Sequence, residues 1–272
     1  MKEKENRAIE SVVTKDSFIN ALKYVGLDSN MNIEVHASLS SFGYVAGGAM
    51  TIVDALMEVI TDGGTILMPT QTSYNTDPSS WENPPALPSV WKEIRENMPA
   101  YDPRRSDLSC MGAIAENFRH REGVISSNHP TTSYAAWGRY ARLLCNRQSL
   151  HFPLAEESPA ARLYELKGHV LLLGVDFTSV TSLHLGEYRT EARPIIIRHT
   201  CTETEGKREW KKYLDLDIDS SDFGKIQAEL EKKNLIRETV LNGCRIQLFP
   251  VNCAVDEATK YFEKNSIYDL YR

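Results

Sequence analysis

Apolar positions follow two different periods along the first quarter of the chain. Residues 14–24 and 50–60 carry them at helical spacing, which predicts two amphipathic helices. Shorter apolar runs over 31–36 and 65–68 predict strands, and the second is preceded by an Asp-Gly-Gly turn. A helix followed by a strand–helix–strand unit is typical of an α/β sheet.

Regular periodicity lapses between residues 69 and 105, where seven prolines divide the chain. Only residues 89–98 have helical spacing. Long irregular stretches inside compact domains are usually functional or disordered, and the tryptophans and tyrosines of this one argue against disorder. We expect a long loop on the substrate side over about residues 70–108. A plain surface excursion is the alternative.

The remainder of the chain returns to alternating elements. The run over 169–175 is continuously apolar, as in a strand buried on both faces. No Gly-, Ser- or Pro-rich linker separates the C-terminal third, so we expect residues 1–272 to form a single domain whose sheet becomes mixed. The pattern predicts helices over 111–120, 134–147, 158–167, 179–188, 221–234 and 254–265, and strands near 124 and over 194–203, 208–216 and 238–252.

Composition narrows the functional classes. The net charge is −6 with no basic stripe, which argues against a nucleic-acid partner. No run approaches the length of a membrane span, and the charged N-terminus lacks the apolar core of a signal peptide. Five scattered cysteines without a C-x-x-C pair are typical of reduced thiols. We expect a cytoplasmic protein that has no membrane partner.

A loop of small residues over 36–49 joins the first predicted strand to the second predicted helix. Glycines and hydroxyls before a helix N-terminus form a ready anion site, because backbone N–H groups and the helix dipole point to the same place. Gly43 and Gly48 have the spacing of P-loop glycines, but Ala49 and Met50 stand where that motif needs Lys and Ser or Thr. The loop therefore holds an anion without phosphoryl transfer, or is a structural connection.

His184 and Glu187 lie three residues apart on a predicted helix that follows the buried strand. That spacing places both side chains on one helix face, near the strand end where α/β sheets bind ligands. A carboxylate beside an imidazole fixes its tautomer and raises its basicity, as a general base requires. The alternative is a surface pair without a role.

Other chemical candidates are less well supported by their surroundings. His129 and Pro130 precede Thr132 and Ser133, either of which could cap the next predicted helix, so this cluster is a site or a loop-to-helix junction. The histidines lack the paired spacing of metal ligands, and we expect no metal. Cys110 has no neighbour in sequence that would activate its thiol.

Taken in order, these motifs resemble the aminoglycoside 3-N-acetyltransferase family, the antibiotic N-acetyltransferases. The similarity extends over about residues 14–265. It rests on His36-Ala37-Ser38-Leu39-Ser40-Ser41-Phe42-Gly43 with Gly47-Gly48-Ala49, Leu67-Met68-Pro69-Thr70, Ser127-x-His129-Pro130-x-x-Ser133-x-Ala135-x-x-Gly138, Ser158-Pro159, Leu172-Leu173-Gly174-Val175 and Thr181-Ser182-Leu183-His184-x-x-Glu187.

The resemblance implies a three-layer α/β/α fold with a mixed β-sheet, distinct from the GNAT fold. It also implies acetyl-CoA as co-substrate, a cationic aminocyclitol amine as acceptor, and His184 with Glu187 as the catalytic pair. A homodimer is left open. Cofactor binding is then expected at His36, Ala37, Ser38, Leu39, Ser40, Ser41, Gly43, Gly47, Thr70, Ser109, Met111, Gly112, His129 and Pro130.

Under this hypothesis His184 takes a proton from the attacking amine in a ternary complex. Backbone N–H groups or hydroxyls of residues 38–41 or 109–112 stabilise the oxyanion. Three rival hypotheses stay open: a homologue acting on another amine, a thiol-dependent acyltransferase using Cys110 with a histidine, and a CoA- or nucleotide-binding module without turnover.

Overall fold

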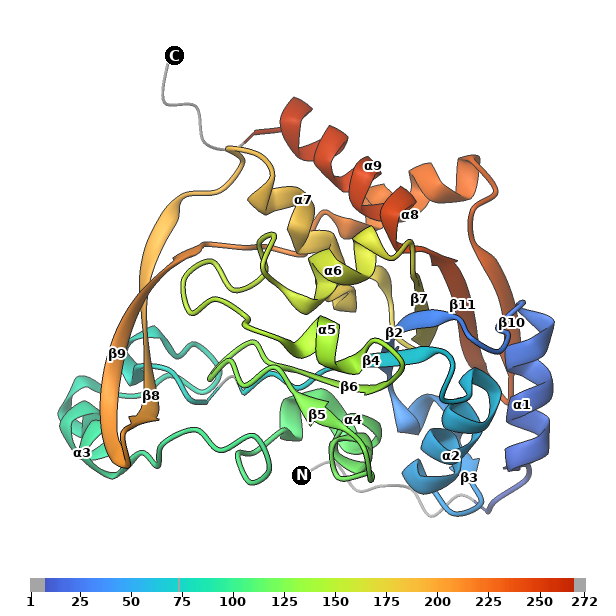
Figure 1. Ribbon diagram of the computed structural model, residues 1–272, viewed down its shortest axis with the longest axis horizontal. Coiled ribbons are helices and arrows are strands. Elements are labelled where there is room, and N and C mark those ends of the chain that lie inside the picture. Colours follow the sequence, from blue (N-terminus) through green and yellow to red (C-terminus); the bar gives the residue numbers. More distant parts are fainter. Residues whose placement is uncertain (1–7, 73, 267–272) are drawn as a thin grey trace.

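A mixed β-sheet forms the centre of the molecule (Figure 1). The computed structural model describes residues 8–72 and 74–266. Within them the main sheet has the strand order β10-β11-β7-β2-β4-β6-β5, in which β7, β2 and β4 run parallel and their neighbours run antiparallel. The strands are β2 (Asn32–Ala37), β4 (Thr65–Pro69), β5 (Ile125–Ser126), β6 (Tyr134–Gly138), β7 (His169–Leu173), β10 (Arg237–Leu241) and β11 (Cys244–Pro250).

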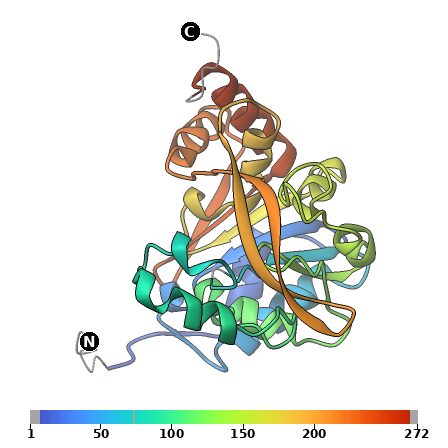
Figure 2. The same cartoon turned by 90° about the vertical axis from the view of Figure 1, so that its left-hand side faces the viewer.

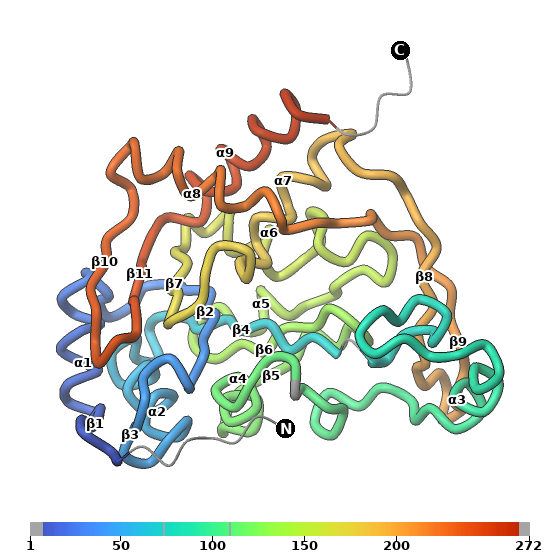
Figure 3. Tube along the Cα trace, turned by 180° about the vertical axis from the view of Figure 1, so that it is seen from behind, coloured from blue at the N-terminus to red at the C-terminus, as the bar shows by residue number. Residues whose placement is uncertain are grey.

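Helices cover both faces of this sheet, as Figures 1 and 3 show. Alternate residues of β7 enter opposite layers: Leu171 and Leu173 pack into one apolar core, and Val170 and Leu172 into the other. The predicted three-layer α/β/α arrangement with a mixed sheet is confirmed. The first core contains α1 (Lys15–Tyr24), α2 (Ala49–Ile60) and α4 (Gly112–Arg119), and the second contains α5 (Ala141–Cys145), α6 (Pro159–Glu165), α7 (His184–Tyr188), α8 (Phe223–Lys232) and α9 (Val251–Lys264).

Two further strand pairs lie outside the main sheet. β1 (Val12–Val13) pairs with β3 (Tyr44–Val45). The long antiparallel ribbon of β8 (Ile195–Thr204) and β9 (Lys207–Leu216) lies at the left of Figure 1 and crosses the front of the molecule in Figure 2. We expected residues 194–216 to extend the main sheet, and that prediction is wrong. The ribbon instead packs against the proline-rich segment over residues 69–105, which we call the excursion.

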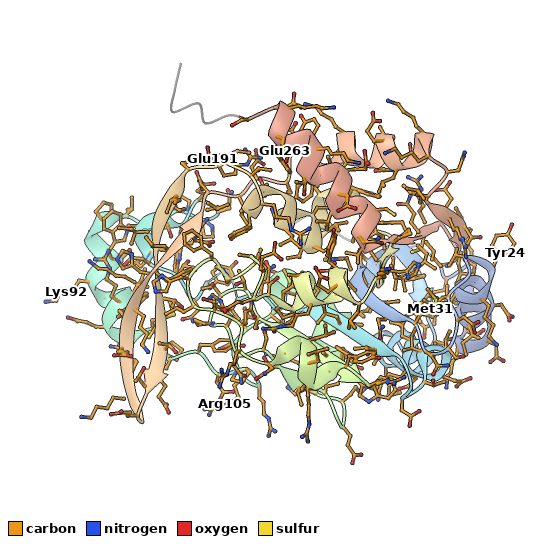
Figure 4. All side chains as sticks on the ribbon, turned by 45° about the horizontal axis from the view of Figure 1, so that its top comes forward. Tyr24, Met31, Lys92, Arg105, Glu191 and Glu263 are labelled. Carbon is orange, nitrogen blue, oxygen red and sulfur yellow. The ribbon has the colours of Figure 1, made fainter. Side chains whose placement is uncertain are left out.

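Hydrogen bonds order that excursion against the ribbon. Its short helix α3 (Trp91–Asn97) ends beneath β9, where Arg208 and the Trp210 indole donate to the Arg95 carbonyl at 2.8 and 3.0 Å. The Arg95 guanidinium also forms a bidentate pair with Asp77 and holds the pKa of that carboxyl well below its ordinary value. The exposed Lys92 points away from the ribbon (Figure 4). The described residues of the excursion are therefore folded against the ribbon rather than disordered.

The predicted helix over 134–147 is wrong in its first half. Residues 134–138 form β6, which pairs with β4 in the register Met68↔Ala135, and only residues 141–145 are helical. The strand ends at Gly138, whose φ of 99° and close approach to the Gly64 carbonyl leave no space for a Cβ. Neither Thr132 nor Ser133 caps a helix, since a strand follows.

The predicted strand over 238–252 is a hairpin rather than one strand. Asn242 and Gly243, with φ values of 50° and 85°, form the two-residue turn between β10 and β11. An Asn-Gly pair is a strong hairpin signal, which the apolar pattern alone did not weigh. The hairpin joins the main sheet through β7, so the prediction of a sheet that becomes mixed is confirmed for this segment.

The described residues contain no helix both long and apolar enough to cross a membrane.

Candidate functional site

A cavity of about 320 Å³ opens at the carboxyl ends of the three central parallel strands. This is the edge where open α/β sheets bind ligands. Three of its walls come from residues that end β2, end β4 and follow β7, and a fourth comes from the first turn of α4. It is lined by Val35, His36, Ala37, Met68, Pro69, Gln71, Cys110, Met111, Ile114, Ala115, Thr132, Leu154, Val175, Thr178, Ser179, Thr181, His184 and Ile218.

The predicted His184–Glu187 pair forms at this cavity. A short 3-10 turn over Thr181–Leu183 leads into α7, so His184 occupies the start of the helix and Glu187 the same face one turn later. His184 Nδ1 lies 2.5 Å from Glu187 Oε2, and the Glu187 side chain is completely buried. Because the carboxylate accepts from Nδ1, Nε2 carries the lone pair that a general base needs.

Two further groups hold Glu187 in place. Arg193 Nε donates to Oε1 at 2.5 Å, and the backbone N–H of Asp219 donates to the same oxygen at 3.2 Å. Arg193 is itself 5% exposed and donates through Nη2 to the Asp219 carbonyl at 3.0 Å. The carboxylate is thus charge-paired and oriented before any substrate binds. The sequence did not predict Arg193 or the Asp219 N–H as partners, because both lie in loops outside α7 and no regular spacing connects them to Glu187.

The small-residue loop folds differently from a P-loop. Residues Leu39–Phe42 form a 3-10 turn, and β3 intervenes before α2 begins at Ala49. Ser38 N–H donates to the Leu173 carbonyl at 2.9 Å, which ties the loop to the end of β7. Gly47 has a φ of 81° and would place a Cβ 2.4 Å from the Thr51 hydroxyl, so a structural need explains this glycine.

The structure brings together only part of the predicted binding set. His36, Ala37 and Met111 line the cavity with His184, whereas the other predicted cofactor residues do not line it. Gly112 begins α4 close to the carbonyl of Ala37. The residues outside the lining are Ser38, Leu39, Ser40, Ser41, Gly43, Gly47, Thr70, Gly112, His129 and Pro130, while the Ser109 side chain lies outside the described part of the chain.

His129 has a structural environment. Its ring is 2% exposed, Nε2 faces the Leu150 carbonyl at 3.2 Å, and Nδ1 accepts from the backbone N–H groups of Thr131 and Thr132 at 3.2 and 3.0 Å. A carbonyl on one nitrogen and donors on the other fix the neutral Nε2–H tautomer. Burial lowers the pKa of His129 to about 4.

This neutral imidazole predicts a loss of stability in acid. The histidine of the unfolded chain titrates near pH 6.5. As the pH falls from there to about 4, the unfolded state binds a proton and the folded state does not, so the unfolded state is favoured. We expect His129 to account for about 3 kcal/mol of lost unfolding free energy over that interval. Urea unfolding at pH 7 and pH 4 should show a flatter dependence for His129→Gln than for wild type. Identical slopes would contradict this assignment.

A second cavity, of about 450 Å³, adjoins the first and shares Gln71, Thr132 and Ile218 with it. The excursion supplies Tyr74, Trp81 and Glu82, and the end of the ribbon supplies Asp215 and Asp217. Sequence reasoning placed the excursion on the substrate side but did not find these acidic groups. Asp215 and Asp217 alternate with apolar residues at the end of β9, and this alternation is the signal in the sequence that could have indicated them.

Carboxylates outnumber cations among the residues that line this second cavity. Arg198 is its one lining cation, and its Nε contacts the buried Asp215 at 3.2 Å. Burial raises the pKa of Asp215, although Arg198 and the hydroxyl of Tyr188 act in the opposite direction. Asp217 and Glu82 face solvent at the rim. The cavity therefore suits a cation. Within the described residues no cluster of three or more histidine, cysteine or acidic side chains could hold a metal.

A family model described as aminoglycoside 3-N-acetyltransferase matches residues 35–263. The chain belongs to this family. Among curated proteins, the prophage-derived aminoglycoside N(3')-acetyltransferase-like protein YokD of Bacillus subtilis is 41% identical over 93% of both chains. Aminoglycoside N(3)-acetyltransferase VIII of Streptomyces fradiae is 31% identical, over 80% of this chain and 76% of its own. The aminoglycoside 3-N-acetyltransferases named here are acyltransferases.

Solved structures of relatives share the fold. The YokD crystal structure superposes with a TM-score of 0.91 at 39% identity, covering 96% of this chain and 97% of that one. A structure titled AAC-IIIb binary with CoASH has a TM-score of 0.83 at 25% identity over 94% and 98% of the two chains. A structure of sisomicin-bound AAC-VIa has a TM-score of 0.81 at 25% identity over 94% and 100%. The expected difference from the GNAT fold is confirmed.

Proposed function

We propose that this aminoglycoside 3-N-acetyltransferase homologue transfers acetyl from acetyl-CoA directly to the 3-amino group of a 2-deoxystreptamine antibiotic. One observation carries the proposal: an imidazole held by a buried carboxylate lines a cavity that adjoins a second, acidic cavity. The first cavity suits an acyl thioester and the second a polycation. His184 lines the first of these two adjoining cavities.

His184 is the general base of this proposal. The amine nitrogen attacks the thioester carbonyl, the C–N bond forms, and His184 Nε2 takes a proton from that nitrogen. Glu187 stabilises the imidazolium that results, and Arg193 holds the Glu187 side chain in place. The tetrahedral intermediate then collapses, the C–S bond breaks and its electron pair leaves with sulfur. No protein nucleophile is required.

The thioester arm fits the first cavity by its chemistry. Met68, Met111 and Ile114 give it apolar walls, and α4 begins at Gly112, close to the Ala37 carbonyl at the end of β2. No side chain caps the N–H groups of the first turn of α4, so we propose them as the donors that stabilise the oxyanion. The CoASH-bound relative supports acetyl-CoA as the acetyl donor.

The acidic cavity predicts electrostatic binding of the acceptor. Replacing both rim carboxylates, as Glu82→Gln with Asp217→Asn, should raise KM for the amine about tenfold at low salt with kcat nearly unchanged, because two charges that attract the cation are removed. A tenfold change in affinity corresponds to about 1.4 kcal/mol. Steady-state kinetics at two ionic strengths measure this. The control is Glu122→Gln with Glu165→Gln, which removes the same charge from exposed positions outside this cavity. Equal KM values in the two double variants would contradict the assignment.

The proposed function is tested by measuring thiol release from acetyl-CoA with a panel of aminoglycosides and simpler amines. We expect turnover with 2-deoxystreptamine compounds and intersecting double-reciprocal lines, which are typical of a ternary complex. Mass spectrometry and NMR of the product should locate the acetyl group on the 3-amino nitrogen. Parallel lines would indicate an acyl-enzyme instead, as expected if Cys110 were the nucleophile. Stabilisation by CoA without turnover of any amine would indicate a binding module.

A further inference from the structure

A cation of the chain itself lies in the acidic cavity. Arg198 on β8 lines that cavity, with Nε 3.2 Å from Asp215 Oδ2 and Nη2 3.9 Å from Asp217 Oδ1. Glu82 is the third carboxylate of the lining. Two of the three carboxylates that would attract a cationic acceptor therefore already have a countercharge from the protein.

The strand register of the ribbon explains this meeting. Arg198 lies opposite Tyr213, and Ile196 lies opposite Asp215, so these four side chains share one face of the ribbon. Arg198 and Asp215 are diagonal neighbours on that face, a separation that a long side chain can span. The guanidinium therefore extends toward the end of β9, where the acidic groups lie.

The two oxygens of Asp215 have different partners. Oδ1 accepts from the Tyr188 hydroxyl and from the Leu216 N–H, the second at 2.9 Å. Oδ2 faces Arg198. The Asp215 side chain is 5% exposed and burial raises its pKa, so a cation beside Oδ2 stabilises the charged form. Arg198 thus occupies the oxygen that an ammonium group of the acceptor would need.

Arg198 is held less firmly than the arginine behind the catalytic pair. The Arg193 side chain is 5% exposed and its Nε donates to Glu187 at 2.5 Å. The Arg198 side chain is 31% exposed, and its contacts with Asp215 and Asp217 are longer. A partly exposed guanidinium keeps part of its hydration, so separating it from a carboxylate costs less than breaking a buried pair. Arg198 is therefore the cation that a ligand can replace.

We propose that Arg198 is a tethered counter-cation that determines acceptor specificity. An ammonium group of the acceptor displaces the guanidinium from Asp215, and the arginine side chain moves into solvent. A single ammonium exchanges one cation for another and gains little. An acceptor with two or more ammonium groups pairs with Asp215 and Asp217 together, so Arg198 selects polyamines over monoamines. This inference rests on the proposed function, which assigns the acceptor to this cavity.

Calorimetric binding of sisomicin, a polyamine, and of glucosamine, a monoamine, tests the inference without turnover. Arg198→Met keeps an apolar stem and removes the charge. We expect it to lower the Kd of sisomicin about tenfold at low salt and that of glucosamine less than about threefold, relative to wild type. The control is Arg105→Met, which removes the same charge from an exposed pair with Asp102 outside the cavity. It should leave both Kd values within about twofold of wild type.

The Asp215 carboxylate separates displacement from a general change in charge. The gain in sisomicin affinity should vanish when Arg198→Met is combined with Asp215→Asn, because the carboxylate for which the two cations compete is then gone. Arg198→Gln keeps amide donors near Asp215 without the charge, and carries the test if the methionine variant does not fold.

Unchanged or weaker sisomicin binding in a folded Arg198 variant, or a gain that persists with Asp215→Asn, would overturn the inference alone. Absence of sisomicin binding in wild type and variants would overturn it as well. Thiol release is measured separately. Its absence with every amine, while the gain in binding is observed, would overturn the proposed function and not the role of Arg198.

Discussion

His184→Asn should lower kcat by about 10²- to 10⁴-fold while leaving the affinity for CoA unchanged. The expected size follows from general-base catalysis. The substitution should leave the fold intact, because Glu187 keeps Arg193 and the Asp219 N–H as partners when the imidazole is gone. Thiol-release kinetics measure the rate, and calorimetry measures CoA binding. A weakened CoA complex with normal kcat would instead identify His184 as a binding residue.

Cys110→Ala is the matched control for His184→Asn. Cys110 lines the same cavity and its thiol is exposed, with Sγ 3.4 Å from the Gln71 carbonyl, but the described residues place no histidine in hydrogen-bond contact with it. Under direct transfer this variant keeps its rate. If Cys110→Ala lost turnover as fully as His184→Asn, the ping-pong route through a thioester on the enzyme would replace the mechanism proposed here.

Local sequence features predicted the parts of the site that local geometry controls. The continuous apolar run of β7 and the three-residue spacing of His184 and Glu187 each depend on a few neighbouring residues, and both are found in the structure. The helix predicted over 158–167 is found as α6, where Ser158 precedes Pro159 as the cap and its hydroxyl accepts from the Ala161 N–H at 3.0 Å. Period and capping therefore determined these elements and placed His184 and Glu187 on one helix face.

Contacts between distant segments could not be predicted in the same way. Arg193 and the Asp219 N–H reach Glu187 from loops on either side of the ribbon, and no spacing in the sequence encodes that meeting. The segment from Tyr134 to Gly138 is rich in alanine and was assigned to a helix, yet pairing with β4 makes it a strand. Tertiary pairing overrides local propensity in this segment.

The surroundings of His129 could not be predicted from its motif. The resemblance implies cofactor binding for this residue, and that stays a prediction. In the structure its ring is enclosed by Leu150, Thr131 and Thr132, in the turn that leads into β6. Burial is a property of the folded chain, so the sequence alone could not predict these contacts.

Glu187→Gln should destabilise the protein by about 3–5 kcal/mol and also lower kcat at least 100-fold. The carboxylate is fully buried between Arg193 and His184, and its neutralisation leaves a guanidinium that is 5% exposed with only the half-exposed Asp219 carboxylate, 4.0 Å away, as countercharge. Urea unfolding measures the first effect and thiol release the second.

Two further variants separate the causes of those losses. Glu156→Gln breaks a comparable pair with Arg189, but its carboxylate is 61% exposed, and we expect a change within about 0.5 kcal/mol. Combining Glu187→Gln with Arg193→Met removes both buried charges and should recover part of the stability without recovering kcat. Recovery of kcat in that double variant would mean that Glu187 serves the fold alone. Continued loss of kcat in a stable protein would locate its catalytic contribution in the imidazole that it holds.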